Sequence, residues 1–336
     1  MNERRHRVRG LREAVAFAAV CLVTFVAMTC IGVVILFRPG ADKLGVTFSS
    51  SYSQDLDLDP EEVFTALVSD LGAKRVRIPV YWSDQETAPG VYDFSALDSL
   101  MRIADAHGTE VTLAIGMKVP RWPECYLPLF VNGMNDEELN AAVYRYDQAL
   151  ISYAKTYPAL ARWQVENEPL FPYGNCPRPS LERLTREVSL VRALDTAHPV
   201  MLTVSGEQEP WLDVSSIADT IGVSMYRFAY NDVLGAVAFP YGPLYYRVHA
   251  IITKFFAKDV IISELQMEPW FTDDPQKPES MVVPFTVDDF VDHMDFVKRT
   301  GIHEVLLWGA EWWYYQKVHG DPSLWNIAKQ TFSESK

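Results

Sequence analysis

Glutamates at the ends of two strand-like runs are the chain's best candidates for chemistry. Glu264 follows the run "IIS", and Glu166 and Glu168 follow "RWQV". A carboxylate beside buried strand residues is costly unless it is paired or functional. Two carboxyl groups that converge on one centre can cleave a glycosidic bond, one by protonating the leaving oxygen and the other by attacking the sugar. Glu168 and Glu264 therefore predict this chemistry.

The elements that position these glutamates follow from an alternation of β-rich runs with longer helical patterns, eight of each after residue 42. Such alternation favours parallel strands, and eight units favour closure into a (β/α)8 TIM barrel of the α/β class. Glu168 ends the fourth predicted strand and Glu264 the seventh. Active sites of such barrels form at the carboxyl ends of the strands. The predicted strands lie near residues 44–50, 74–82, 110–117, 163–168, 200–206, 219–227, 259–266 and 303–313.

Length and composition fit one large folded domain with a short appendage. The chain has 336 residues, of which 49% are hydrophobic and 22% charged, and a barrel of this kind takes roughly 250. Residues 1–40 hold six Arg against two Glu, a net charge of +4, so the total of −14 leaves −18 for the remainder. That acidity disfavours nucleic acid as a partner. The sequence contains no glycine-rich phosphate loop, paired CxxC or HExxH motif, so we predict no nucleotide, metal or other cofactor.

The amino terminus predicts a membrane segment. Residues 14–37 contain no charged side chain, and about 20 apolar residues are enough for a helix to cross a bilayer. Five arginines precede this segment. The positive-inside bias then predicts a single-pass signal-anchor in the cell membrane, with a cytoplasmic tail (residues 1–13) and an extracytoplasmic domain (residues 42–336). A cleaved signal peptide is the alternative, although its apolar core is normally about 7–15 residues long.

The sequence Asn167–Glu168–Pro169 at the end of the fourth predicted strand resembles glycoside hydrolase clan A, which includes the family 5 cellulases and β-glycanases. The resemblance covers nearly the whole chain after the apolar segment. It implies an eightfold βα barrel in which Glu168 is the acid/base and Glu264, 96 residues later, is the nucleophile. "WQVENE" is also similar to the β-galactosidase families of this clan, so the resemblance is to the clan rather than to one family.

The same resemblance assigns roles to four further residues. Arg77, in "VRIPV", would lie beside the nucleophile as a charge-stabilising donor. Asn167 would hold the sugar 2-hydroxyl, a contact that strengthens in the transition state. Tyr226 would donate a hydrogen bond to the nucleophile, and Trp308 would form a floor on which a sugar ring stacks.

Aromatic residues follow many of the predicted strands, as expected of a carbohydrate-binding cleft. We predict that Trp82, Trp122 and Trp270 contact substrate. Packing under long loops is the alternative, and about half of such residues should do this. The same two interpretations apply to Trp211, Trp312 and Trp313. Lys118 and Glu311 also lie near strand ends, where a solvated position is the simpler expectation.

Two cysteines fall in loops that follow neighbouring predicted strands. Cys125 follows the third strand and Cys176 follows the fourth. An exported domain sits in an oxidising compartment that permits disulfides. We therefore predict a Cys125–Cys176 disulfide that clamps the cleft wall, with two free thiols as the alternative.

The leading hypothesis is a membrane-anchored retaining glycosidase that cleaves a β-linked oligo- or polysaccharide, with its two carboxyl groups about 5–5.5 Å apart. A catalytically silent carbohydrate-binding barrel and a transglycosylase are the alternatives. Strand alternation places Glu166 on the same face as Glu168 but one layer deeper. We expect Glu166 to have a structural partner there, such as Arg77 or another buried donor.

Overall fold

The computed structural model describes residues 20–25, 28, 38–177, 179–231 and 233–335. The chain divides into two compact units, residues 1–39 and residues 40–336. The predicted tail (1–13) and most of the predicted membrane segment (14–37) lie outside the described residues. Within the described ranges, no helix combines the length and the hydrophobicity that crossing a bilayer requires.

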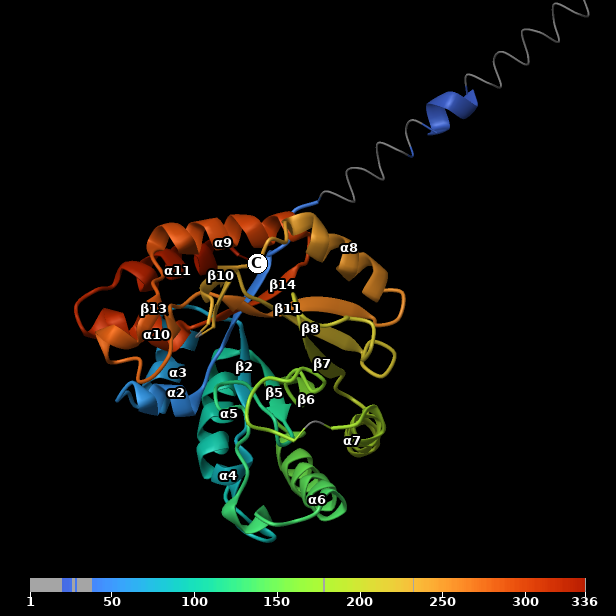
Figure 1. The fold of residues 1–336 in the computed structure, drawn as a ribbon, viewed down its shortest axis with the longest axis vertical. Helices are drawn as coiled ribbons and strands as arrows, with labels where there is room; N and C mark the ends of the chain where they lie inside the picture. Colours follow the sequence, from blue (N-terminus) through green and yellow to red (C-terminus); the bar gives the residue numbers. More distant parts are fainter. Residues whose placement is uncertain (1–19, 26–27, 29–37, 178, 232, 336) are drawn as a thin grey trace, which may run out of the picture. The chain divides into compact units, whose positions relative to one another are not determined.

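Eight parallel strands of the second unit close into a barrel (Figure 1), which confirms the predicted fold of this part of the chain. Around the barrel their order is β1-β14-β11-β8-β7-β6-β5-β2. The strands are β1 (Lys43–Thr47), β2 (Arg75–Pro79), β5 (Glu110–Ile115), β6 (Leu160–Val165), β7 (Val200–Ser205), β8 (Thr220–Met225), β11 (Asp259–Gln266) and β14 (Glu304–Trp308).

Helices follow the strands and pack their apolar sides against the outside of the barrel. Several begin at caps visible in the sequence, such as Asn135, whose side chain and that of Glu138 form a capping box. The helices are α2 (Ser50–Asp55), α3 (Pro60–Ser69), α4 (Trp82–Gln85), α5 (Ser95–His107), α6 (Asp136–Ala154), α7 (Leu181–Leu194), α8 (Pro243–Thr253), α9 (Val287–Thr300), α10 (Ala310–Val318) and α11 (Ser323–Glu334). The prediction of the last strand, residues 303–313, was too long, because β14 ends at Trp308 and residues 310–313 begin α10.

Short hairpins and 3₁₀ turns stand in the loops after the strands, on the carboxyl side of the barrel. The hairpins follow β2, β8 and β11, and one 3₁₀ turn follows β5. These elements are β3 (Glu86–Ala88) with β4 (Val91–Tyr92), β9 (Phe228–Asn231) with β10 (Gly235–Ala238), β12 (Trp270–Phe271) with β13 (Met281–Val283), η1 (Leu129–Val131) and η2 (Pro278–Ser280).

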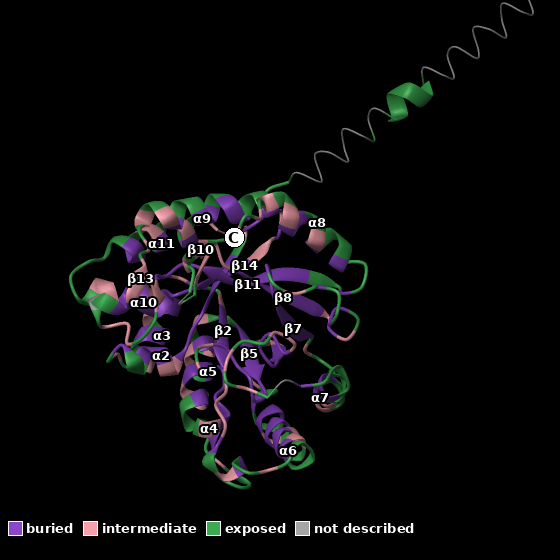
Figure 2. Ribbon diagram, in the orientation of Figure 1, coloured by how far each residue is buried: buried purple, intermediate pink, exposed green. Residues whose placement is uncertain are grey.

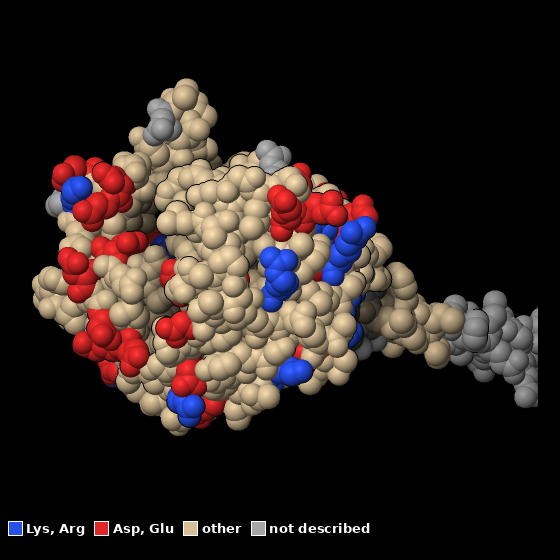
Figure 3. Space-filling model, turned by 90° about the horizontal axis from the view of Figure 1, so that it is seen from below, with Lys and Arg blue, Asp and Glu red and all other residues tan. Residues whose placement is uncertain are grey.

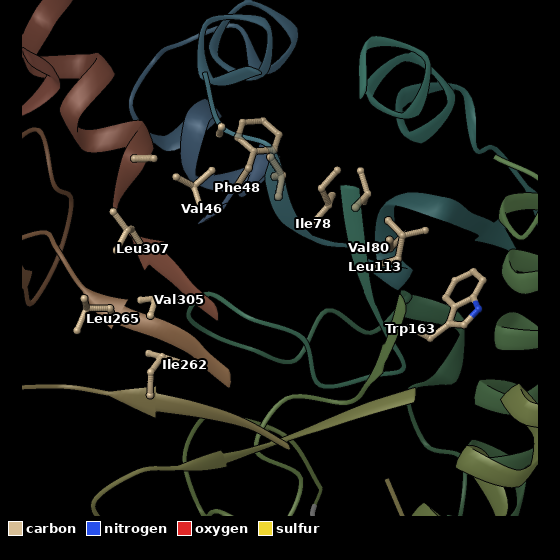
Figure 4. Packing of buried hydrophobic residues seen from close by; sticks show 14 of the residues in the cluster. Val46, Phe48, Ile78, Val80, Leu113, Trp163, Ile262, Leu265, Val305 and Leu307 are labelled. Carbon is tan, nitrogen blue, oxygen red and sulfur yellow. The ribbon is translucent and has the colours of Figure 1, made fainter. Parts of the chain in front are cut away.

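The core has two parts, because neighbouring residues of a strand face opposite sides of the sheet. Val305 and Leu307 belong to the large cluster between strands and helices, whose packing Figure 4 shows with side chains such as Val46 and Trp163. Met201, Ile261 and Leu306 form a separate buried cluster. We place this second cluster inside the barrel, since Leu306 lies between two residues of the first.

Burial and charge are distributed as expected for a folded acidic protein. The strands are buried and the outer sides of the helices are exposed (Figure 2). On the face of the molecule in Figure 3, acidic side chains are more abundant than basic ones, in keeping with the net charge of −14.

Candidate active site

Arg77 joins three strands at the carboxyl end of the barrel. It stands on β2, and its side chain is fully buried. Nη1 donates to Glu264 Oε1 on β11 at 2.8 Å, and Nη2 donates to Asn167 Oδ1 after β6 at 2.8 Å. Nε donates to Gln164 Oε1 at 2.7 Å. The predicted contact between Arg77 and Glu264 is therefore present, and the same guanidinium also orients Asn167.

A bulge in β11 aims Glu264 at this centre. The register of β11 against β8 shifts between Ile262 and Glu264, and such bulges redirect side chains. The carbonyl oxygen of Ser263, at the shift, accepts hydrogen bonds from Arg77 Nη1 at 3.0 Å and from the Thr47 hydroxyl at 3.3 Å. Ser263, the residue at the register shift, is thus hydrogen-bonded to β2 and β1.

Both carboxylate oxygens of Glu264 are held by neighbours. Arg77 binds Oε1, and the Tyr226 hydroxyl donates to Oε2 at 3.0 Å, as predicted. Glu207, after β7, in turn accepts hydrogen bonds from the Tyr226 backbone N–H at 3.1 Å and from the Tyr246 hydroxyl. Glu264 is only 5% exposed, so its carboxylate is fixed in rotation within a nearly closed site.

Glu168 lies beside Glu264 and is buried at the same centre. Its backbone N–H donates to the Thr203 hydroxyl on β7 at 2.8 Å, and its side chain is buried. Burial, followed by the negative charges of Glu264 and Glu124, raises the pKa of Glu168 well above its usual value. A carboxyl group that keeps its proton near neutral pH can act as a general acid.

Glu124 is a third carboxyl group at the centre, and the sequence reasoning missed it. Its Oε1 accepts a hydrogen bond from Asn167 Nδ2 at 3.1 Å, and its Oε2 lies 3.2 Å from Lys118 Nζ. Burial is the main cause that raises the pKa of Glu124 to about 7. Its position directly before Cys125 was the available signal, because the predicted disulfide would hold this residue close to Glu168.

Lys118 is buried, which contradicts the expectation of a solvated side chain. Its ammonium group donates to the carbonyl oxygens of Glu168 at 2.9 Å and Phe171 at 3.2 Å. Together with the ion pair to Glu124, these contacts fasten the loop after β5 to the loop after β6. Glu311, the other residue expected at the surface, is fully buried and accepts a hydrogen bond from the Ser49 backbone N–H at 2.5 Å.

The predicted Cys125–Cys176 disulfide is confirmed. It joins the loop after β5 to the loop after β6, with the two Cα atoms 5.0 Å apart. Glu124 precedes one half-cystine directly, and Glu168 lies eight residues before the other. The disulfide therefore helps to hold the third carboxyl group beside the acid candidate.

Glu166 lies outside the barrel, so the expectation that it occupies a deeper inner layer is wrong. The expected structural partner is present and is another buried donor, Arg183 of α7, which donates to its Oε1 at 2.6 Å. The Lys118 backbone N–H donates to its Oε2 at 2.6 Å. The backbone is left-handed at Glu166 (φ 55°) and at Glu168 (φ 41°). Strand alternation therefore ends after Val165, and the Glu166 side chain turns toward the helices.

Glu166 belongs to a buried cluster of acids around one cation. Arg183 also lies 3.1 Å from Glu187 Oε2. Burial, and then the charge of Glu166, raises the pKa of Asp147 on α6 to about 8 and also raises the pKa of Glu187. Gly116 is needed beside this cluster, because a Cβ there would lie 2.8 Å from the Glu166 carboxyl carbon. The cluster is structural and does not face the Arg77 centre.

The predicted aromatic contacts divide into exposed and buried residues. Trp122 is 61% exposed and packs against Tyr173, with ring centroids 5.7 Å apart. Trp270 is partly buried, and its ring centroid lies 6.0 Å from that of Tyr226. Trp122 and Trp270 are therefore still candidates for sugar contacts.

Trp82 is fully buried, so the prediction that it contacts substrate is wrong. Its indole N–H donates to Glu86 Oε2 at 2.6 Å, and its ring stacks on Tyr146 at 5.4 Å. Packing is also the role of the other buried tryptophans in the loops, which are Trp211, Trp312 and Trp313.

Trp308 ends β14 and carries a cation on one ring face. The Arg121 guanidinium lies 4.1 Å from the Trp308 ring and 3.6 Å from the Tyr52 ring. Glu268 pairs with Arg121 at 2.5 Å, and Glu311 lies 3.5 Å from it. The ring that was predicted to form the sugar-binding floor is thus only 7% exposed.

No cluster of three or more His, Cys, Asp and Glu side chains within the described ranges has the geometry to hold a metal ion. The contacts at the Arg77 centre are instead hydrogen bonds and ion pairs between protein groups. This arrangement supplies one carboxyl group fixed by two donors, Glu264, and a neighbouring one whose pKa is raised by burial, Glu168.

Comparison with known proteins gives the same fold. No family model matches the chain. The β-galactosidase BgaB of Geobacillus sp. (strain Y412MC61) is 27% identical over 149 residues, which cover 37% of this chain and only 22% of BgaB. The structural neighbours are glycoside hydrolases of the TIM-barrel type.

Two solved structures illustrate this likeness. A GH5_18 protein from Bifidobacterium longum subsp. infantis superposes with a TM-score of 0.60 at 13% identity, over 88% of this chain and 80% of that one. The endo-1,4-β-D-mannanase of Thermotoga petrophila RKU-1 superposes with a TM-score of 0.53 at 16% identity, over 81% of this chain and 88% of that one. At such identities the comparison establishes a shared barrel fold.

Proposed function

We propose that this chain is a retaining glycoside hydrolase that cleaves a β-linked oligo- or polysaccharide. The observation that supports this most directly is the Arg77 guanidinium, which holds Glu264 and Asn167 together at the carboxyl ends of three strands. A purely structural arginine would not need a second buried carboxyl group with a raised pKa beside it, and Glu168 is such a group.

In the first step Glu264 attacks the anomeric carbon while Glu168 gives its proton to the leaving oxygen. A covalent glycosyl-enzyme forms, the glycosidic bond breaks, and Glu168 is left as a carboxylate. Neutralising Glu264 removes one of the charges that raise the pKa of Glu168. Glu168 is then a better base, takes a proton from water, and the resulting attack releases the sugar and restores Glu264.

The neighbouring residues fit this sequence of steps. Arg77 and Tyr226 orient the Glu264 carboxylate and stabilise its charge when the sugar leaves. Asn167 is held by Arg77 through its oxygen and by Glu124 through its nitrogen. Glu124 therefore lies beside the Asn167 amide nitrogen and is a second candidate for contact with the substituent at C2 of the sugar.

The names of the similar proteins support a β-linked substrate. They include two β-galactosidases, an endo-1,4-β-D-mannanase, and GH5_18 variants in complex with Manβ1-4GlcNAc. The sugars differ, whereas the linkage in these names is β throughout. The exposed Trp122 beside Tyr173 is our candidate for a platform on which a further sugar ring stacks.

We further propose that the enzyme works at the outer face of a membrane, anchored by residues 14–37. The support is the uncharged length of this segment and the arginines before it. Flotation of the full chain with phospholipid vesicles, and resistance of this association to alkaline carbonate, are the expected results. Release by carbonate would contradict the anchor.

The experiment for the hydrolase is a screen of aryl β-glycosides and β-linked polysaccharides with the full chain and three variants. Glu168→Gln and Glu264→Gln should each lower kcat by at least about 10³-fold, since each removes a group that acts in the transition state. The control is Glu61→Gln, an exposed first-turn residue of α3, which should retain turnover. Substantial turnover in either active-site variant would refute the assignment.

A further inference from the structure

Helix α8 and the turn after it carry an exposed apolar stripe. Phe255 is 80% exposed, and the other members are between 42% and 59% exposed. They recur at helical spacing on the side opposite Tyr246, Arg247, Ala250 and Thr253, which are buried. The stripe consists of Leu244, Val248, Ile251, Ile252, Phe255 and Phe256.

This stripe is unusual for a helix on the outside of a barrel. Such helices normally present polar residues outward and apolar residues toward the core, whereas the exposed side of α8, green in Figure 2, carries the apolar residues of the stripe. Large contiguous apolar patches on protein surfaces mark contacts with partners or membranes. The bordering cations are already paired, Lys254 with Asp259 at 3.0 Å and Lys258 with Asp219 at 2.9 Å. A contact made here is therefore mainly apolar.

The stripe runs to the amino-terminal face of the barrel, away from the Arg77 centre. Phe255 and Phe256 precede Asp259, the first residue of β11, so they lie where the strands begin. Glu264 lies toward the other end of the same strand. A surface that contacts the stripe thus leaves the carboxyl ends of the strands free.

The start of the barrel unit is fixed close to α8. The Gly40 N–H donates to the Lys298 carbonyl at the end of α9 at 2.8 Å, and Arg247 of α8 donates to the next carbonyl, that of Arg299, at 2.6 Å. Helices α8 and α9 lie side by side (Figure 1). Gly40 is pressed so tightly on Ile302 that a Cβ would lie 2.1 Å from the Ile302 carbonyl oxygen.

The apolar segment of the sequence ends only three residues before this fixed point, at Phe37. Three extended residues span at most about 11 Å, and the headgroup layer on each side of a bilayer is roughly 5–8 Å thick. If residues 14–37 cross the membrane, Gly40 must lie at or close to the headgroups. The adjacent α8 stripe is then within reach of the same lipid surface.

We propose that the apolar stripe of α8 docks on the phospholipid surface into which residues 14–37 insert. This inference rests on the proposed membrane anchor. Amphipathic helices bind in this way by placing their apolar face about 5–10 Å into the boundary between headgroups and acyl chains. With the stripe on the lipid surface, the bilayer contacts the side of the barrel and leaves the site at the strand carboxyl ends uncovered.

The test uses the full chain in vesicles of phosphatidylcholine and phosphatidylglycerol, with and without nitroxide-labelled lipid. Cys21 and Cys30 are replaced by serine, and an environment-sensitive fluorophore is attached to Phe255→Cys. The matched control is Leu129→Cys, which is 86% exposed in the loop after β5. We expect the nitroxide lipid to quench the label at position 255 at least several-fold more than the label at 129. Adding Ile251→Ser and Phe256→Ser should remove this difference.

Equal quenching at the two positions, in protein that floats with the vesicles, would overturn the docking and leave the anchor standing. Shielding of position 255 that depends on protein concentration instead of nitroxide lipid would assign the stripe to a second copy of the chain, which also overturns the proposal. Protein that does not float would remove the anchor and the docking together. Hydrolysis of β-glycosides is measured separately and is unaffected by any of these outcomes.

Discussion

Replacing Glu166 with glutamine should destabilise the fold while sparing the chemistry two residues away. Glu166 accepts hydrogen bonds from Arg183 and from the Lys118 backbone N–H, both at 2.6 Å, and its side chain is fully buried. Glutamine has one oxygen, so it can satisfy the backbone N–H or the guanidinium but not both. Its amide nitrogen must then face a donor.

The expected loss of stability in Glu166→Gln follows from these contacts. Losing a hydrogen bond to a charged group costs about 1.5–3 kcal/mol. Glu187 lies 3.1 Å from the same guanidinium, and the charge of Glu166 is one cause of its raised pKa. Because glutamine removes that charge, Glu187 can pair with Arg183 more readily and offset part of the lost stability. We therefore expect a loss of about 2 kcal/mol for Glu166→Gln. Arg183→Met leaves the buried acids without a cation and should cost about 3–5 kcal/mol.

The assay is urea denaturation of the full chain followed by tryptophan fluorescence, with kcat measured on the same preparations. Arg186→Met is the matched control on the same helix, since its ion pair with Glu182 is exposed and should contribute less than about 0.5 kcal/mol. Glu168→Gln should show the opposite behaviour to Glu166→Gln, with turnover lost. A Glu166→Gln protein of native stability and no turnover would refute the reasoning.

Three further predictions concern pH and the disulfide. The pKa of Asp147 is about 8 in the fold and about 3.9 in an unfolded chain. Between these values the fold holds a proton that the unfolded chain has released, so the stability of the native protein falls as pH rises toward 8. The free energy of unfolding of Asp147→Asn relative to that of the native protein, measured by urea denaturation, should therefore rise from about pH 5 to pH 8. A difference that does not change with pH would contradict this. Glu124→Gln removes a charge that raises the pKa of Glu168, so the alkaline limb of kcat/KM should move to lower pH; an unmoved limb would contradict the coupling. The cysteines are 51 residues apart, for which chain entropy gives about 4 kcal/mol, so Cys176→Ser should lower the urea midpoint and reduce kcat/KM. An unchanged midpoint would show that the cross-link adds no stability.

The sequence predicted what depends on periodicity and strand ends. The eight strands and the positions of Glu168 and Glu264 at strand ends follow from a regular barrel. The contacts of Glu264 with Arg77 and Tyr226, which are present, were implied by the resemblance to clan A rather than by periodicity. The disulfide followed from the same regularity, because neighbouring strands bring their loops together.

Irregular backbone accounts for what the sequence did not predict. Glu166 and Glu168 both have left-handed backbone, which breaks the alternation that placed Glu166 inside the barrel. Glu124 and Arg121 also have positive φ, at 65° and 86°, and both come from the loop after β5. No periodic pattern places such residues, so the third carboxyl group and the cation over Trp308 emerged only in three dimensions.

The burial of tryptophans was a second source of error. An indole after a strand can stack on a sugar or fill space beneath a loop, and the sequence does not distinguish these uses. Trp82 fills space against Tyr146, whereas Trp122 is exposed. The two tryptophans differ in exposure because α6 packs over Trp82 and does not cover Trp122.

The most direct test of the two-glutamate mechanism is to trap the covalent intermediate. A panel of 2-deoxy-2-fluoro β-glycosides with good leaving groups, covering glucose, galactose and mannose configurations, is incubated with the full chain and with Glu264→Gln. Peptide mass spectrometry should find one glycosyl adduct, on Glu264, in the native protein and none in the variant. An adduct on Glu168, Glu124 or any other residue would contradict the assignment of Glu264 as nucleophile.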